Sequence, residues 1–232
     1  MSDQPGNRWD ERYDHERYYY GEEPNAFIAT HLPTLPKGTA LFLGEGEGRN
    51  AVYAAGLGHR VLAVDSSEVG RRKALALAAA RNVTLDYRCA DVLADDWSTD
   101  PWNNRPWSLV VLCFAHLAPA DAIAMHARVA DALAPGGTLL LSSFSKAQLG
   151  RTSGGPPRLE WLHDLEELRA QFPGLAWDQA VEREVDLSEG SGHRGAAMVI
   201  EMIGRKSKEA WSGGGWGKGG WSKGSWDNTS KN

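Results

Sequence analysis

Leu43-Gly44-Glu45-Gly46-Glu47-Gly48-Arg49-Asn50 is the stretch that decides the fold of this chain. It follows the apolar run 40–43 and precedes the apolar segment 50–57, so we predict a strand, a glycine-rich loop and a helix in that order. Glycines let the backbone approach a ligand closely, and the amides at the start of a helix point toward that ligand. The stretch therefore predicts a binding loop for a nucleotide or a related molecule.

The spacing of the glycines selects among such ligands. A dinucleotide fingerprint, G-x-G-x-x-G, requires its third glycine at position 49, but Arg49 stands there and the third glycine is Gly48. An arginine at this point obstructs the packing of a pyrophosphate, and Glu45 and Glu47 repel it. A ligand that carries an ammonium and a sulfonium tolerates the same carboxylates. The loop therefore favours S-adenosylmethionine over NAD.

Strand-like and helix-like segments alternate on both sides of this loop. Such alternation implies a parallel sheet with right-handed crossovers, and two consecutive strands at the end imply an antiparallel edge. We predict an α/β fold with a doubly wound, mostly parallel seven-stranded sheet and an antiparallel C-terminal hairpin. The expected strands are 40–43, 61–64, 83–88, 108–114, 138–144, 182–187 and 196–203, and the expected helices are 50–57, 68–81, 119–134 and 162–172.

The chain divides into three expected regions. Residues 1–34 contain an aromatic N-terminal arm, residues 35–206 form the binding domain, and residues 207–232 are a tail. Glycine-rich sequence loses much backbone entropy on folding and offers few apolar partners, so we expect the tail to be disordered. Its function stays open between a linker and an arm that stacks on bases through Trp211, Trp216, Trp221 and Trp226.

Composition excludes several classes of function. The formal net charge is −5, and the tail holds four lysines against two acidic residues, so the acidity belongs to the domain. An acidic domain argues against a general nucleic-acid binder, apart from weak contacts made by the tail. The two cysteines, Cys89 and Cys113, fit reduced thiols of the cytoplasm better than a disulfide framework or a metal site. The sequence contains neither a secretion signal nor a transmembrane run, so no membrane partner is expected.

Acidic residues follow the next two predicted strands. In doubly wound sheets, ligands bind beyond the carboxyl ends of the strands. Asp65 is suited to the ribose hydroxyls, or else caps a helix; Asp91 is suited to an adenine amine, or else is a plain loop residue, and Val92 would cover the ring. The predicted cofactor-binding residues are Gly44, Glu45, Gly46, Gly48, Asn50, Asp65, Ser66, Asp91, Val92 and Phe114.

These residues resemble class I S-adenosylmethionine-dependent methyltransferases, which have a Rossmann-like fold. The chain is most similar to their tellurite-resistance and thiopurine-methyltransferase-like branch. The resemblance implies that the loop glycines wrap the methionine part of the cofactor. Many members have Cys where this chain has Glu45, which would bind the cofactor's ammonium or alter access to it. The segments that carry the resemblance are 44–53, 58–67, 133–137, 154–157 and 189–195.

The branch implies a small, soft methyl acceptor, which is a thiol or an oxyanion of selenium or tellurium. A thiolate, a selenolate or a tellurite oxyanion needs no strong general base. The chain after the fourth predicted strand reads Cys113-Phe114-Ala115-His116 and lacks an Asn-Pro-Pro-Tyr-like motif for amine methylation. The polar candidates for catalysis are His116, His193 and Arg194, each of which also fits a structural role.

The aromatic arm is predicted to close the site. Trp9, Tyr19 and Tyr20, together with the loop 150–157, would form a lid that excludes water. Two other functions stay open at this point. One is an NAD-dependent oxidoreductase, which Arg49 disfavours. The other is a noncatalytic or RNA-associated protein that acts through its aromatic tail.

Overall fold

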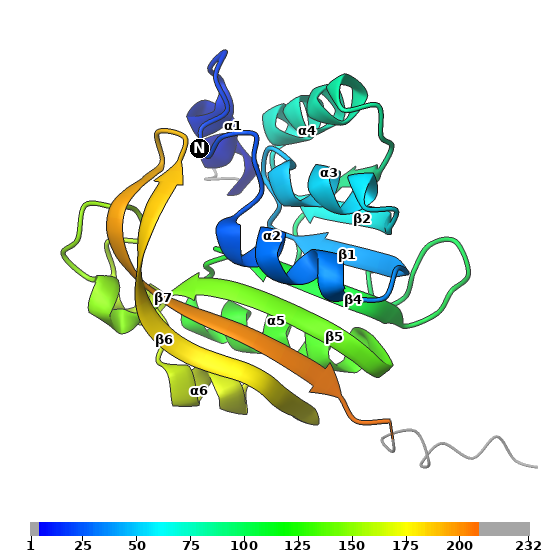
Figure 1. Ribbon diagram of the computed structural model, residues 1–232. Coiled ribbons are helices and arrows are strands. Elements are labelled where there is room, and N and C mark those ends of the chain that lie inside the picture. Colours follow the sequence, from blue (N-terminus) through cyan, green and yellow to red (C-terminus); the bar gives the residue numbers. More distant parts are fainter. Residues whose placement is uncertain (1–4, 209–232) are drawn as a thin grey trace, which may run out of the picture.

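The structure is a computed structural model that describes residues 5–208, drawn in colour in Figure 1. The predicted disorder of the tail and the role of its four tryptophans lie outside these residues.

Seven strands form one sheet with the order β3-β2-β1-β4-β5-β7-β6 (Figure 1). The five strands from β3 to β5 are parallel to one another, whereas β7 is antiparallel to both β5 and β6. This arrangement confirms the predicted fold class. The strands are β1 (Thr39–Leu43), β2 (Arg60–Asp65), β3 (Asp86–Cys89), β4 (Trp107–Cys113), β5 (Leu133–Phe144), β6 (Leu175–Glu189) and β7 (His193–Lys206).

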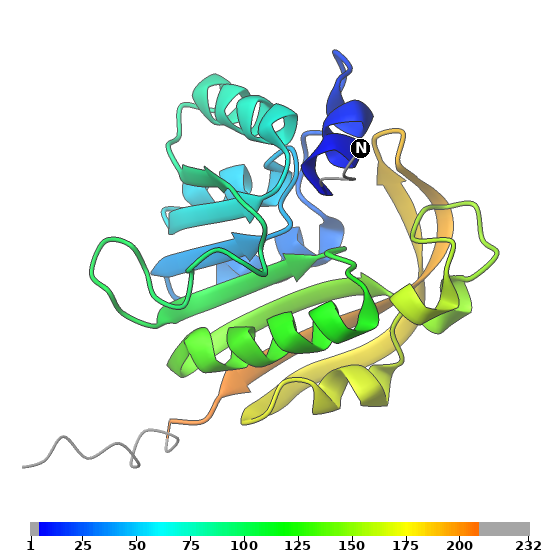
Figure 2. The same ribbon diagram turned by 180° about the vertical axis from the view of Figure 1, so that it is seen from behind.

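Helices cover both faces of the sheet. Figure 1 shows α2 and α3 in front of the strands, and Figure 2 shows α5 and α6 on the opposite face. The sequence order reverses between β1 and β4, so the crevice expected for a ligand opens at the carboxyl ends of these two strands. The helices are α1 (Pro5–Tyr13), α2 (Ala26–His31), α3 (Arg49–Gly56), α4 (Glu68–Ala80), α5 (Pro119–Ala132) and α6 (Leu165–Ala170).

The core lies on both sides of the central strands. Ala40 and Phe42 of β1 pack in a cluster with residues of α2, α3 and α4, whereas Leu41 and Leu43 pack in a second cluster with residues of α5 and α6. All four side chains are fully or almost fully buried. A strand that is covered on both faces needs apolar residues at successive positions, which is why the run 40–43 shows no alternation with polar residues.

Local hydrogen bonds set the ends of several helices. The Ser67 hydroxyl accepts from the Gly70 amide, so α4 begins at Glu68, which is the predicted start of this helix. The Asp164 carboxylate accepts from the amides of Glu166 and Glu167, so α6 begins at Leu165 rather than at the predicted residue 162. The N-terminal arm also holds more regular structure than its sequence indicated, because α1 and α2 both lie within residues 1–34.

Several predicted strand boundaries differ from the observed ones, and β5 begins at Leu133 rather than at residue 138. The third strand begins at Asp86 rather than at 83, because Val83 and Leu85 pack against Val52 and Leu77 of the helices instead of pairing with β2. The fourth strand ends at Cys113 because Phe114 adopts a left-handed backbone conformation with φ 55°. This turn takes the chain out of the sheet at the ligand-binding edge.

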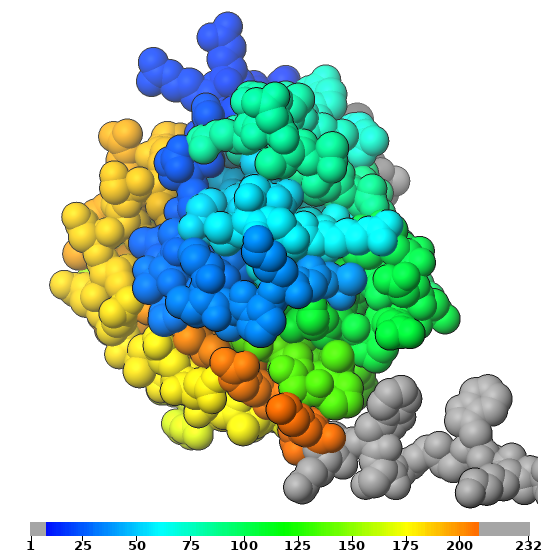
Figure 3. Space-filling model, turned by 45° about the vertical axis from the view of Figure 1, so that its right-hand side comes forward, coloured from blue at the N-terminus to red at the C-terminus, as the bar shows by residue number. Residues whose placement is uncertain are grey.

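The C-terminal hairpin is longer than predicted and reaches the N-terminal segment. The amides of Ser191 and Gly192, at the tip between β6 and β7, donate to the carbonyl of Tyr19 at 2.9 Å each. The space-filling view in Figure 3 shows the blue N-terminal segment between the yellow hairpin and the cyan helices. The arm therefore bridges the two ends of the sheet above the crevice. No helix within residues 5–208 has both the length and the apolar character needed to cross a membrane.

Candidate functional site

A cavity of about 560 Å³ lies at the carboxyl ends of the parallel strands. The glycine loop, the ends of β2 and β4, the N-terminal segment and the hairpin tip all contribute to its walls. Gly46, Gly48 and Arg194 are outside the lining. The predicted residues that line it are Trp9, Tyr19, Tyr20, Gly44, Glu45, Asn50, Asp65, Ser66, Asp91, Val92, Phe114, His116 and His193.

The second and third glycines of the loop shape its path instead of facing the cavity. Gly46 and Gly48 have φ values of 59° and 89°, which side chains rarely adopt. A Cβ on Gly48 would lie 2.4 Å from the Cβ of Ala74, so this glycine brings the loop against α4. A Cβ on Gly46 would lie 2.6 Å from the Tyr13 hydroxyl, so this glycine lets the arm pack on the loop.

Glu45 caps the helix that follows the loop. Its Oε1 accepts from the amides of Asn50 and Ala51 at 2.8 Å each, at the positive end of α3. Burial raises the pKa of this carboxyl to about 7, although these hydrogen bonds and Arg49 oppose the shift. Glu45 also lines the cavity. Glu45, which stands where many members of the resembled family have Cys, therefore has a structural role in capping α3. Its contact with the cofactor stays a prediction.

Replacing Glu45 by Gln should stabilise the protein in a pH-dependent way. The unfolded chain releases this proton above about pH 4.5, whereas the folded protein keeps it up to about pH 7, so the wild type loses stability as the pH rises through this window. We expect Glu45→Gln to raise the free energy of unfolding by about 2 kcal/mol at pH 8 and by less than half as much at pH 5. Urea unfolding at both pH values measures the difference. An equal change at both values would contradict the titration.

Asp65 joins the glycine loop to the start of the next helix. Its two carboxylate oxygens accept from the amides of Gly46 at 3.0 Å and Ser67 at 2.9 Å. Burial raises its pKa, opposed by these hydrogen bonds. Asp91 accepts from the Leu93 amide at 2.9 Å and also faces the cavity. Carboxylates along the cavity can accept hydrogen bonds from ribose hydroxyls and from an amine, and they attract a cationic ligand. These side chains therefore fit S-adenosylmethionine.

His116 is held at both of its ring nitrogens. Nδ1 lies 2.8 Å from the carbonyl of Trp161, which only accepts, so Nδ1 carries the proton. Nε2 then accepts from the Phe144 amide at 3.2 Å. Burial lowers the pKa of His116 to about 4. His116 lines the cavity but has no ring nitrogen free for an acceptor, so this geometry favours its structural role over the predicted catalytic one.

His193 is held at one ring nitrogen only. Its Nδ1 lies 2.7 Å from Oε2 of Glu189, across the turn of the hairpin. The same oxygen accepts from Arg49 at 2.9 Å, and Oε1 accepts from the side-chain amide of Asn25 at 2.8 Å. Among residues 5–208, no protein group forms a hydrogen bond with Nε2 of His193. Of the three catalytic candidates, His193 is therefore the one that lines the cavity and has a ring nitrogen without a hydrogen bond to the protein.

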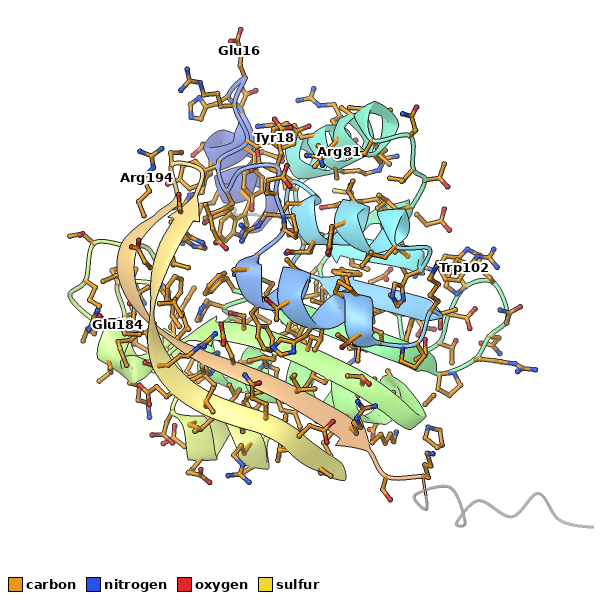
Figure 4. All side chains as sticks on the ribbon, viewed as in Figure 1. Glu16, Tyr18, Arg81, Trp102, Glu184 and Arg194 are labelled. Carbon is orange, nitrogen blue, oxygen red and sulfur yellow. The ribbon has the colours of Figure 1, made fainter. Side chains whose placement is uncertain are left out.

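Arg194 faces solvent on the outside of the hairpin. Its Nε donates to the carbonyl of Gly190 at 2.8 Å, and its side chain projects away from the molecule (Figure 4). Successive residues of a strand point to opposite sides, so the orientation of His193 toward the cavity turns Arg194 outward. The predicted contact of Arg194 with an anionic acceptor does not fit this position.

The N-terminal segment is tied directly to the glycine loop. Oε2 of Glu47 accepts from the amide of Tyr19 at 2.7 Å, and Asp10 accepts from the Ser67 hydroxyl at 2.6 Å. Trp9 stacks on Tyr13 with the ring centroids 5.7 Å apart. Packing of the arm and a role as a lid are compatible, because the aromatic side chains that are held in this way line the cavity.

Four polar residues hold the loop, the hairpin and the arm together without having been predicted as site residues, namely Arg49, Glu47, Glu189 and Asn25. In the sequence, Arg49 and Glu47 only disfavoured a pyrophosphate, whereas Glu189 and Asn25 look like ordinary polar residues. One signal was available for Glu189. It is four residues before His193 across two glycines, a spacing that places both side chains on one side of a tight hairpin.

Comparisons with known proteins agree with this geometry. Residues 40–137 match a family model described as a methyltransferase domain. None of the curated proteins matches the chain. Among solved structures, NodS, an N-methyltransferase of Bradyrhizobium japonicum WM9 in complex with S-adenosyl-L-homocysteine, is similar with a TM-score of 0.65 and 13% identity, covering 88% of this chain and 99% of its own.

Two further structures are similar in fold. One comes from work on the conversion of a disulfide bond into a thioacetal group during echinomycin biosynthesis, with a TM-score of 0.65 and 20% identity over 90% of this chain and 95% of its own. The other is TehB from Haemophilus influenzae, with a TM-score of 0.64 and 16% identity over 88% of this chain and 68% of its own. The methyltransferase domain matched over residues 40–137, the glycine loop and the acidic cavity together indicate a methyltransferase with S-adenosylmethionine as its cofactor.

Proposed function

We propose that this chain methylates a small, soft nucleophile, either a thiol or an oxyanion of selenium or tellurium. The observation that carries the proposal is the cavity of about 560 Å³, which joins the acidic cofactor end to an aromatic end. Phe114 stacks on Phe144 with centroids 4.5 Å apart, and Tyr19 packs edge-on against Tyr20 at 4.9 Å. A cavity of this size has room for small acceptors but not for a folded macromolecule.

The chemistry of methyl transfer suits this site. S-adenosylmethionine supplies a methyl group that is already activated by its sulfonium, so the protein mainly has to align the acceptor and exclude water. The aromatic arm and the hairpin tip enclose the acceptor end, which favours desolvation of a soft nucleophile. The resemblance of the sequence to the tellurite-resistance branch supports an oxyanion as acceptor, and the neighbour from the thioacetal study supports a reaction at sulfur.

A transfer assay tests the proposal. The protein is incubated with S-adenosylmethionine labelled in its methyl group and with a panel of thiols, thiopurines, tellurite, selenite, halides, amines and alcohols. We expect label in a thiol or in a selenium or tellurium product. Label that appears only in an amine or an alcohol would overturn the proposed acceptor class and leave the methyltransferase assignment intact.

The remaining functional alternatives differ in their support. Arg49 at the start of α3 and the matched methyltransferase domain speak against an NAD-dependent oxidoreductase. The RNA-associated alternative depends on the tail and stays a prediction, which deletion of residues 207–232 and an RNA-retention assay would test. Both cysteines are free thiols, in keeping with the cytoplasmic location that we propose.

A further inference from the structure

Glu189 and His193 form a carboxylate–histidine pair at the tip of the β6–β7 hairpin. They are opposite each other in the strand register, and a distance of 2.7 Å joins Nδ1 to Oε2. Both side chains are almost fully buried, with 10% of Glu189 and 4% of His193 exposed. A buried pair with this geometry fixes the orientation of the imidazole ring.

The carboxylate of Glu189 is kept ionised by its neighbours. Burial by itself would raise its pKa, but the hydrogen bond from His193 and the charge and hydrogen bond of Arg49 together lower it to about 2. An ionised carboxylate only accepts hydrogen bonds, so the proton in the pair belongs to Nδ1 of His193. Nε2 of the neutral ring is then left with its lone pair.

Aromatic rings pack around the imidazole ring of His193. The ring of His193 lies 4.4 Å from Tyr20, 4.6 Å from Phe114 and 5.3 Å from Phe144 between centroids. Burial lowers the pKa of His193, and Glu189 partly offsets this effect, so the ring is neutral near pH 7. A neutral imidazole in an apolar wall of the cavity is able to accept a proton from a ligand.

We infer that the acceptor is a small protonated thiol, that Nε2 of His193 takes its proton, and that Glu189 is the positioning residue for His193. This inference rests on the proposed function and narrows it to one acceptor class. As the S–H bond breaks, its proton goes to Nε2 and the acceptor sulfur bonds to the methyl carbon. The electron pair of the broken methyl–sulfonium bond stays on the departing sulfur. The proton then passes from His193 to water.

The presence of a base, Nε2 of His193, favours a thiol over an oxyanion as the acceptor. A thiol with an ordinary pKa is mostly protonated at pH 7 and attacks only as its thiolate, so a base beside it raises the rate. A tellurium or selenium oxyanion is already charged and gains nothing from a base. The surrounding rings also suit an apolar thiol body better than a strongly hydrated oxyanion.

The base is connected to the cofactor loop through Arg49. This arginine begins α3 directly after the loop, and its guanidinium donates to Glu189 at 2.9 Å and to the carbonyl of Tyr20 at 3.1 Å. Arg49, which distinguishes the loop from a dinucleotide fingerprint, thus also orients the hairpin. The titratable and charged groups that face His193 from the elements packed around it are Arg12, Tyr20, Arg49, His116 and Glu189.

Two thiols that differ in ionisation test the inference. An alkyl thiol is protonated at pH 7, whereas 4-nitrothiophenol is already a thiolate and needs no base. We expect His193→Gln to lower kcat for the alkyl thiol by about 100-fold or more and for 4-nitrothiophenol by less than about 5-fold. Equal losses for both thiols, or no loss with the alkyl thiol, would overturn the role of His193. Methylation by the wild type of tellurite or selenite but of neither thiol would overturn the inference while the proposed function stands.

The positioning role of Glu189 has its own measurements. Long-range nitrogen NMR should show the Nδ1–H tautomer of His193 in the wild type and its loss in Glu189→Gln. Because Glu189 raises the pKa of His193, its replacement should move the acidic limb of the kcat/KM profile for the alkyl thiol to lower pH. A merely structural role would leave both readouts unchanged, which would overturn the assignment.

A matched control is available on the same strand. Glu184 pairs with Arg151 at 2.8 Å on the exposed surface of β6, away from the cavity (Figure 4). Glu184→Gln should leave the NMR signature and the pH profile unchanged. Binding of S-adenosyl-L-homocysteine should stay within about 3-fold of wild type in His193→Gln, which shows that the cofactor end is intact. If Glu189→Gln fails to fold, the two-thiol comparison with His193→Gln still decides whether His193 is the base.

Discussion

Asp65→Ala should weaken the binding of S-adenosylmethionine and of S-adenosyl-L-homocysteine by about 100-fold to 1,000-fold. The carboxylate positions the glycine loop through the Gly46 amide, and it faces the cavity where the ribose hydroxyls are expected. Hydrogen bonds to a charged group contribute roughly 1.5–3 kcal/mol each, so the loss of two bonds at the lower end of this range, about 3–4 kcal/mol, gives an effect of this size. Calorimetry should show micromolar binding in the wild type and almost no heat in the variant.

Thermal unfolding provides a second measurement for Asp65. A ligand at about 100 times its Kd stabilises a protein by roughly 2.7 kcal/mol, so saturating S-adenosyl-L-homocysteine should raise the Tm of the wild type and leave that of Asp65→Ala almost unchanged. Asp178→Ala is the control, because Asp178 is half-exposed and pairs with Arg205 at the far end of the hairpin. A change in affinity of less than about 3-fold would remove Asp65 from the binding site.

The protein should lose most of its stability between pH 6.5 and pH 4. Three histidines lie together next to the cavity, with His126 buried and His116 and His163 partly buried, and with centroids 5.4 Å apart for His116 and His163 and 5.8 Å apart for His126 and His163. Burial lowers the pKa of His116 and of His126 to about 4 and that of His163 to about 3. Neutral rings are therefore required in the folded state.

The direction of this pH effect follows from linkage. An unfolded histidine binds a proton below about pH 6.5, whereas the folded protein resists protonation until about pH 4, so each ring costs about 1.4 kcal/mol per pH unit within this window. Three rings together lower the free energy of unfolding by roughly 6 kcal/mol at pH 5, which approaches the whole stability of an ordinary domain. Urea unfolding at pH 7.5, 6 and 5 measures the slope.

Single substitutions separate the histidines from other titrating groups. His163→Phe keeps an aromatic ring beside His116 and His126 and removes one titration, so we expect the slope to fall by about 1.4 kcal/mol per pH unit. His15→Gln is the control, because His15 is exposed on the N-terminal arm. An unchanged slope in His163→Phe would show that the acid sensitivity arises elsewhere.

Local sequence was sufficient to predict the order of the helices and strands from β1 onward. The strand, loop and helix around Gly44 follow from an apolar run, a glycine pattern and a helix start, which are all interactions between near neighbours in the chain. The limits of that reasoning appear at Val83, which has the residue type of a strand but packs against Val52 and Leu77. The length of a strand depends on the helices and loops that pack on it, and the hydrophobic periodicity of the sequence contains no information about these contacts.

The roles of individual site residues were also only partly predictable from the sequence. Glu45 could be recognised as unusual from the family resemblance, but its hydrogen bonds to the amides of Asn50 and Ala51 appear only in the structure. His116 and His193 are equal candidates in the sequence. The fold distinguishes them, because the carbonyl of Trp161 and the amide of Phe144 occupy both nitrogens of His116, whereas Glu189 occupies only one nitrogen of His193.

The sequence by itself was sufficient to predict the fold class and a loop that favours S-adenosylmethionine, because glycine spacing and hydrophobic period act through neighbouring residues, and its resemblance to a known family added the methyltransferase prediction. Only the tertiary structure decided how the acceptor end is built. Arg49 and Glu189 are 140 positions apart, and Asn25 and Glu189 are 164 positions apart, yet they meet at one carboxylate. Contacts of this range exist only after the sheet and its C-terminal hairpin have brought both ends of the domain together, and no local pattern encodes them.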